Sequence, residues 1–168
     1  MNTQYSTRYA IGRNEVKTFT TEQLREEFLM TGLMQDDLVN VFYTHYDRFI
    51  VGGAVPVAGS LTLETLDALK SDNFLDRREL GVINVGSTGT VTVDGTVYSL
   101  ENKEALYVGK GAISVVFNSV DGKNPARFYL NSAPAHASFP NKKVGMQDAN
   151  ILHMGSKEAA NERKIHQL

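Results

Sequence analysis

Short stretches in which apolar and polar residues alternate run through most of this chain. Thr90-Val-Thr-Val93 alternates with a period of two, and Thr96-Val-Tyr-Ser-Leu100 follows after Asp94-Gly95. This period is typical of half-buried strands, and an Asp-Gly pair tolerates the positive φ of a two-residue hairpin turn. The pattern predicts a β-hairpin here, at the centre of the stretch from Arg77 to Gly111.

Further β-branched runs, bounded by glycine, proline and aspartate, predict additional strands on both sides of this hairpin. Pro56 favours an edge position for its strand, because proline cannot donate a ladder hydrogen bond. The expected strands cover residues 38–43, 47–53, 55–57, 81–86, 105–108, 112–117 and 126–130. Many short strands separated by turns are typical of an antiparallel barrel or jelly roll, so the expected fold class is all-β.

One short helix is predicted near the N-terminus. Thr20, with Gln23 three residues later, resembles a capping box. Leu24 and Phe28 would share one apolar face of this helix. Gly32 would end it, because glycine readily adopts the left-handed cap conformation. We assign the helix a structural role.

The 168 residues are enough for one well-buried domain, and three segments are expected within them. Residues 1–18 are polar and form either an arm that packs on a neighbour or a loose end. Residues 19–145 hold the strand-rich body. Residues 146–168 are a polar tail with too little apolar surface to close a core alone.

Composition and charge exclude several classes of function. The net charge of -2 argues against nonspecific binding to nucleic acid or to acidic membranes. No apolar run approaches the roughly 20 residues of a membrane span, and no signal peptide is expected. The absence of cysteine excludes disulfides and thiolate metal ligands, and it fits a cytoplasmic protein.

The hairpin followed by Ala-Leu-Tyr-Val-Gly-Lys-Gly resembles a cupin, and that resemblance implies a metal cage of three histidines and one glutamate. With the glycines aligned, Glu79 takes the place of the motif glutamate, while residues 72–75 contain neither expected histidine. Ser114 stands where the third histidine would lie. We therefore expect a metal-free cupin-like barrel over residues 19–145, with no metal ligand and no catalytic residue. Glu79 would instead pair with an arginine or with a neighbouring strand.

Four side chains are candidates for substrate binding: Arg48, Arg77, His45 and His136. Arg77 is followed by Arg78, and such a pair can hold a carboxylate bidentately, although a pair of surface arginines is the more ordinary case. His45 and His136 have no histidine two or four residues away, so neither forms a local metal clamp. They could meet across the fold, bind backbone carbonyls or face a subunit contact.

Several longer segments together resemble one cupin family, the 5-keto-4-deoxyuronate isomerases, also called 4-deoxy-L-threo-5-hexosulose-uronate ketol-isomerases. The matching segments run in order over nearly the whole chain. They are residues 24–29, 43–53 (YTHYDRFIVGG), 74–86 (FLDRRELGVINVG), 89–95, 104–112 (EALYVGKGA), 133–136 and 140–144.

This resemblance implies the interconversion of a 5-keto-4-deoxyuronate and its 2,5-diketo isomer in pectin and uronate breakdown. It also implies a small sugar-acid substrate, a homo-oligomer, and two cupin halves, of which the second carries a zinc ion. No position in this chain matches the zinc ligands. The chain is thus expected to be the N-terminal, inactive part of such an isomerase, with residues 146–168 leading toward a missing second half.

Two other readings of the residues remain open. The chain could be a stand-alone cupin-like module for binding or assembly, without catalysis. It could also be a small sugar-acid binding protein that uses Arg48, Arg77 or Lys110. In either case no cofactor is expected in this chain.

Overall fold

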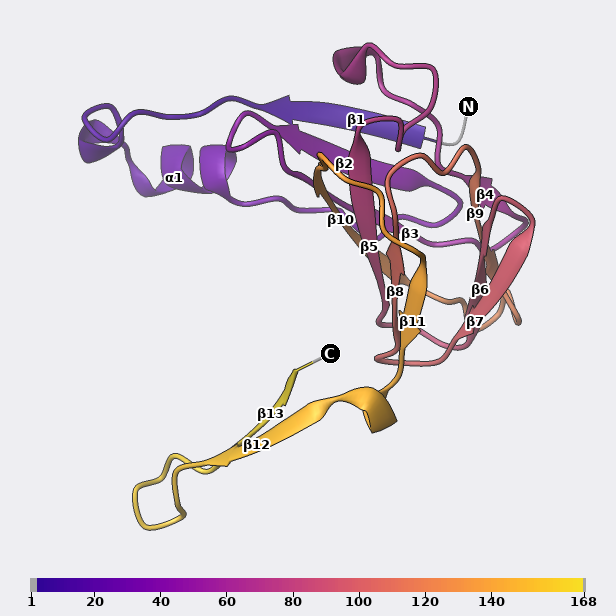
Figure 1. Cartoon of the computed structure of the whole chain (residues 1–168). Coiled ribbons are helices and arrows are strands. Elements are labelled where there is room, and N and C mark those ends of the chain that lie inside the picture. Colours follow the sequence, from indigo (N-terminus) through magenta and orange to yellow (C-terminus); the bar gives the residue numbers. More distant parts are fainter. Residues whose placement is uncertain (1–2, 168) are drawn as a thin grey trace.

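A computed structural model describes residues 3–167 and shows two β-sheets that face each other across an apolar core (Figure 1). The larger sheet has seven strands in the order β1-β2-β3-β10-β5-β8-β11, and the smaller has four in the order β4-β9-β6-β7. The larger sheet comprises β1 (Thr3–Arg8), β2 (Val39–Thr44), β3 (Ile50–Ala54), β10 (Phe128–Pro134), β5 (Arg78–Asn84), β8 (Ala105–Val108) and β11 (Lys142–Val144). The smaller comprises β4 (Leu61–Thr62), β9 (Val115–Ser119), β6 (Gly89–Val93) and β7 (Thr96–Leu100).

The core lies between the two sheets, because alternate residues of each strand point inward. Strand β5 shows this period along its whole length, with Arg78, Leu80, Val82 and Asn84 buried and the residues between them partly exposed. Phe117 of β9 meets Phe128 of β10 across the sheets, with ring centroids 5.3 Å apart. The expected all-β, cupin-like jelly roll is confirmed, although among residues 3–167 the two sheets do not close into one continuous barrel.

The hairpin predicted around Asp94-Gly95 is confirmed. Strands β6 and β7 pair in antiparallel register from Gly89↔Leu100 to Val93↔Thr96. Asp94 and Gly95 have φ values of 47° and 83°, the positive values that a two-residue turn of this hand requires.

The predicted N-terminal helix is also confirmed, but it is shorter than expected. Helix α1 (Thr21–Phe28) begins with the capping box, in which Gln23 N donates to Thr20 Oγ1 and Thr20 N donates to Gln23 Oε1. The chain is already extended at Leu29, so Gly32 lies beyond the helix end. No residue of α1 is buried, so helix packing contributes little to the core.

Other strand boundaries differ from the predicted ones. Residues 3–8, where no strand was expected, form β1 and pair with β2 in parallel, from Thr3↔Val39 to Arg8↔Thr44. Strand β3 begins only at Ile50, because Asp47 and Arg48 have positive φ values of 52° and 54° and form a turn. Short 3-10 helices lie at Val16–Thr18 (η1), Asp67–Leu69 (η2) and Met146–Asp148 (η3).

The segment after β11 forms a separate two-stranded hairpin of β12 (Asn150–Met154) and β13 (Arg163–Gln167). Figure 1 shows this hairpin in yellow, projecting away from the two sheets. All of its strand residues are exposed, including four large apolar side chains with exposed fractions of 37–48%: Ile151, Leu152, Met154 and Ile165. No helix within residues 3–167 is long and apolar enough to cross a membrane.

Candidate functional site

The glutamate at the cupin-motif position faces away from the core. Glu79 lies between the buried Arg78 and Leu80, so the strand period directs it to the outer face of the large sheet. There Tyr107 of β8 donates its hydroxyl to Glu79 Oε2 at 2.8 Å. Burial, and then this hydrogen bond, raise the pKa of Tyr107. The partner of Glu79 is thus a neighbouring strand.

Leu75, within residues 72–75, and Ser114 are two of the three remaining motif positions. Leu75 is part of the apolar core, and the backbone N–H of Ser114 donates to Asp94 Oδ1 at 2.8 Å. Within residues 3–167 no group of three or more histidine, cysteine, aspartate or glutamate side chains is arranged to hold a metal ion. Glu79, Leu75 and Ser114 therefore do not form a zinc-ligand set.

The two candidate histidines lie on the surface. The ring of His45 stacks on Tyr9 at a centroid distance of 4.8 Å and meets Tyr43 edge-on at 5.4 Å. His136 lies two residues beyond the end of β10. In the part of the chain that the structure describes, neither imidazole makes a hydrogen bond or an ion pair, so no polar partner orients them for acid–base work.

The two candidate arginines do converge, on a pocket of about 160 Å³ at one end of the large sheet. Strands β2 and β10 end here and β3 and β5 begin here, because these neighbours run antiparallel. We call this cavity the arginine pocket. Its polar and rim residues are Tyr43, Arg48, Ser71, Arg77, Arg78 and Pro134.

Arg78 is the side chain around which the pocket is built, and only 4% of it is exposed. Its Nε donates to Ser132 Oγ at 3.1 Å, and its Nη2 donates to Ser132 O at 2.8 Å and to Arg48 O at 2.7 Å. Ser132 Oγ in turn donates to Glu79 O at 2.5 Å. These bonds fix the guanidinium plane and tie the β2–β3 turn to β5 and β10.

The remaining nitrogen of Arg78 is left for another partner. Nη1 makes no hydrogen bond within residues 3–167. In that range Arg8 Nε is the one side-chain atom that is both shielded from solvent and without a hydrogen-bond partner, so Nη1 is not shielded. Nη1 is therefore accessible, and Arg78 lines the pocket. Burial lowers the pKa of Arg78 to about 10, Tyr43 acts in the opposite direction, and the nearby Arg48 lowers it further.

Within residues 3–167 no carboxylate forms an ion pair with these arginines. The two ion pairs within residues 3–167 are Lys70–Asp67 and Lys143–Glu104, and neither involves an arginine. Arg77 uses Nη2 to donate to Leu69 O at 2.9 Å and to Lys70 O at 2.6 Å, which holds η2 at the pocket rim. Hydrogen bonds from Asn73 lower the pKa of Asp76, and the positive charge of Arg77 lowers it further by a smaller amount.

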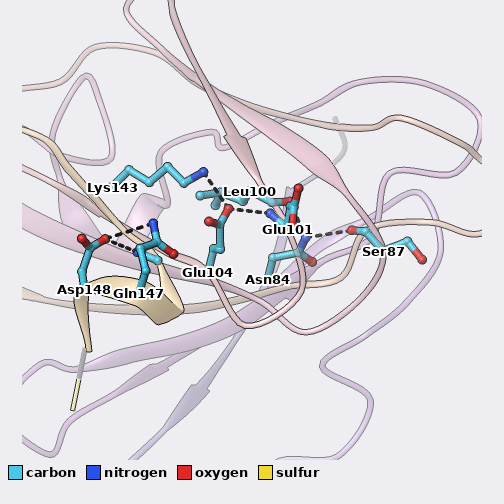
Figure 2. A network of polar contacts seen from close by, with 9 residues as sticks. Asn84, Ser87, Leu100, Glu101, Glu104, Lys143, Gln147 and Asp148 are labelled. Carbon is cyan, nitrogen blue, oxygen red and sulfur yellow. Dashed lines mark hydrogen bonds and ion pairs between the residues drawn. The ribbon is translucent and has the colours of Figure 1, made fainter. Parts of the chain in front are cut away.

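A second polar cluster, shown in Figure 2, lies at the opposite end of β5 and is structural. Asn84 is fully buried, and its Nδ2 donates to Ser87 O at 2.7 Å and to Leu100 O at 2.8 Å. Its Oδ1 accepts from the backbone N–H groups of Gly86 and Arg127, at 3.0 and 3.3 Å. One amide thus satisfies four backbone groups where β5 turns toward β6.

The same cluster anchors β11, the strand that leads to the β12–β13 hairpin. Glu104 Oε2 accepts from the backbone N–H of Glu101 at 2.8 Å and forms an ion pair with Lys143 Nζ at 2.6 Å (Figure 2). The N–H of Glu101 and then Lys143 lower the pKa of Glu104, so this carboxyl is ionised at neutral pH.

A family model described as the KduI/IolB family matches residues 29–168. The chain belongs to the KduI/IolB family. A 4-deoxy-L-threo-5-hexosulose-uronate ketol-isomerase of Formosa agariphila is 58% identical over 168 residues, which is 100% of this chain and 60% of that protein. A protein of the same name from Lachnoclostridium phytofermentans is 47% identical over 158 residues, which is 94% of this chain and 57% of that protein.

This KduI/IolB family chain therefore spans about three fifths of the length of the curated relatives that it matches. Among solved structures, it is similar to an IolB-like protein from Salmonella typhimurium LT2, with a TM-score of 0.51 and 17% identity. That match covers 71% of this chain and 45% of the other, and it supports the fold. The resemblance to the ketol-isomerase family found in the sequence is confirmed.

The sequence placed Arg48 and Arg77 among the candidates and Arg78 only as the second member of an arginine pair that can hold a carboxylate, and it gave no sign of Tyr43 or Ser71. The strand period could have identified Arg78 as buried, because Leu80 and Val82, two and four residues later, point to the same face and are apolar core residues. No sequence pattern connects Tyr43 or Ser71 to Arg78, because their proximity depends on strand pairing across the sheet.

Proposed function

We propose that this chain is the N-terminal part of a 4-deoxy-L-threo-5-hexosulose-uronate ketol-isomerase, which interconverts a 5-keto-4-deoxyuronate and its 2,5-diketo isomer. The observation that carries the proposal is the 58% identity to the Formosa agariphila protein of that name, sustained over 168 residues. A match of this identity over the whole of this chain favours a shared role.

In this proposal the chemical step belongs to a second cupin half. The positions of Glu79, Leu75 and Ser114 do not fit a zinc ion, so no catalytic step is assigned to this chain. Zinc is expected in the second half, and the isolated chain is expected to be inactive on a small sugar-acid substrate.

The β12–β13 hairpin supports a continuation into such a half. An isolated two-stranded hairpin is marginally stable in water, and this one exposes Leu152 and Ile165 as a cross-strand pair. Packing against a following domain would bury that pair. The Lys143–Glu104 ion pair, just before the hairpin, would hold its base on the first half.

We further propose a homo-oligomer located in the cytoplasm. An apolar groove on the outer face of the large sheet, lined among others by Ile83, Ala105 and Val144, supports a contact between copies. Size-exclusion chromatography with light scattering tests the assembly, and a purely monomeric longer protein would contradict it.

A chimera tests the proposed function. This chain would replace the matching 60% of the Formosa agariphila relative, leaving that protein's remaining part in place. The chimera should fold, bind zinc and isomerise the keto-deoxyuronate at a rate within about tenfold of the relative, a difference of about 1.4 kcal/mol in barrier. A folded, zinc-loaded chimera without turnover would show that the chain has another role.

The arginine pocket favours a second candidate, a stand-alone binding module without catalysis. A buried arginine with an open donor is a feature of anion recognition that does not require a metal. The chimera separates the two candidates, because a binding module would not support isomerase turnover.

A further inference from the structure

We propose that the arginine pocket binds the carboxylate group of a small organic acid, with Arg78 as the fixed donor and Arg48 and Arg77 as flanking charges. Binding at this pocket does not require the proposed isomerase activity. Its ligand class follows from the charge, hydrogen bonding and size of the cavity.

The first argument is the unbalanced burial of charge. Arginine is almost never fully buried unless a partner compensates it, because removing a cation from water is costly. Arg78 is buried, yet its three hydrogen bonds all go to neutral oxygens, of Ser132 and Arg48. An anion in the pocket would supply the missing negative charge.

The second argument is preorganisation. Ser132 and the Arg48 carbonyl hold Nε and Nη2 of Arg78, so the guanidinium loses no further freedom when Nη1 binds a ligand. Arg77 is likewise held by two backbone carbonyls at the rim. A site whose donors are already fixed in the free protein is built for a ligand.

The third argument concerns which anion fits. The pocket is small, at about 160 Å³, and leucine, alanine and proline line it beside the arginines. Tyr43 also lines it, and the Tyr43 hydroxyl makes no hydrogen bond within residues 3–167. A carboxylate on a short carbon skeleton can accept from Nη1 of Arg78 and place its carbons against the apolar wall, whereas a free phosphate has no apolar part.

Isothermal titration calorimetry of the 168-residue chain tests this site. D-Galacturonate is the probe, D-galactose is its uncharged counterpart, and inorganic phosphate distinguishes a carboxylate site from a general anion site. Galacturonate should bind, galactose should give no heat, and phosphate should bind at least about tenfold more weakly than galacturonate.

Variants locate the binding. Arg48→Gln and Arg77→Gln change exposed side chains and should each weaken galacturonate binding by about tenfold or more, because each removes a charge-assisted contact. Arg78→Met should abolish it. Arg163→Gln, on the exposed hairpin, is the matched control and should bind like the wild type.

Circular dichroism would confirm that each variant is folded, and Arg48→Gln and Arg77→Gln keep the test decisive if Arg78→Met unfolds. Three results would overturn the proposal. They are equal heats for galacturonate and galactose, phosphate binding tighter than galacturonate, and wild-type affinity in both Arg48→Gln and Arg77→Gln.

Discussion

Replacing Asn84 by alanine removes the amide that joins the end of β5 to the two turns beside it. Four backbone groups lose their partner: the carbonyls of Ser87 and Leu100, and the N–H groups of Gly86 and Arg127. A buried polar group left unpaired costs about 1–3 kcal/mol. The contact with Leu100 is fully buried, whereas the other three are partly buried and can regain water.

Counting the Leu100 carbonyl in full and the other three groups at reduced cost, we expect Asn84→Ala to lower the free energy of unfolding by about 3–5 kcal/mol. This is a large part of the roughly 5–15 kcal/mol that stabilises a typical domain. Urea unfolding followed by circular dichroism measures the loss as a shift of the midpoint.

Asn150→Ala is the matched control. Its amide Nδ2 also donates a hydrogen bond, to Gln167 Oε1 at 2.8 Å, but on the exposed hairpin. Surface substitutions usually change stability by less than about 0.5 kcal/mol, so this variant should unfold almost like the wild type. If Asn84→Ala lost less than about 1 kcal/mol, the reasoning that unpaired backbone groups dominate here would be refuted.

Two further predictions concern the anchor of β11 and the loop beside it. Because hydrogen bonding and Lys143 lower the folded-state pKa of Glu104 below its usual 4.5, this group's stabilisation is present above that pH and is lost as the pH falls through the folded value. Glu104→Gln should therefore cost about 1 kcal/mol at neutral pH and progressively less as the pH falls below 4.5 in urea melts, and a pH-independent difference would contradict the ion-pair account. Gly109→Ala should destabilise by more than about 1 kcal/mol, because an added Cβ would collide with the Phe139 backbone carbonyl. Gly59→Ala is its control, since that Cβ would meet open space, and equal melting temperatures for the two variants would rule out the collision.

Features coded by neighbouring residues could be predicted from the sequence. The Asp94-Gly95 turn needs two residues that tolerate positive φ values, and the Thr20 cap needs Gln23 three residues later. Each feature can therefore be predicted from a few consecutive residues. Strand β1 could not be predicted this way, because it forms by parallel pairing with β2, more than thirty residues later. Strand β9 begins later than the predicted residue 112 for a similar reason, because Asp94 Oδ1 accepts hydrogen bonds from the backbone N–H groups of Ile113 and Ser114.

The candidate site was only half predictable. Arg48 and Arg77 were recognisable as arginines near strand ends, but their meeting with Arg78 depends on β3 and β5 both pairing with β10. Arg77 is exposed and the adjacent Arg78 is buried, because successive residues of an extended chain point to opposite faces. The expectation of no metal ligand rests only on the identity of residues at aligned positions, and it stays a prediction.

The central claim is that the isomerase chemistry and its zinc lie outside this chain. It is tested most directly by measuring zinc content and turnover on the keto-deoxyuronate for the purified 168-residue protein, with and without added zinc. We predict a folded protein that retains no zinc after dialysis and shows no turnover in either condition. Stoichiometric zinc together with turnover would contradict the claim.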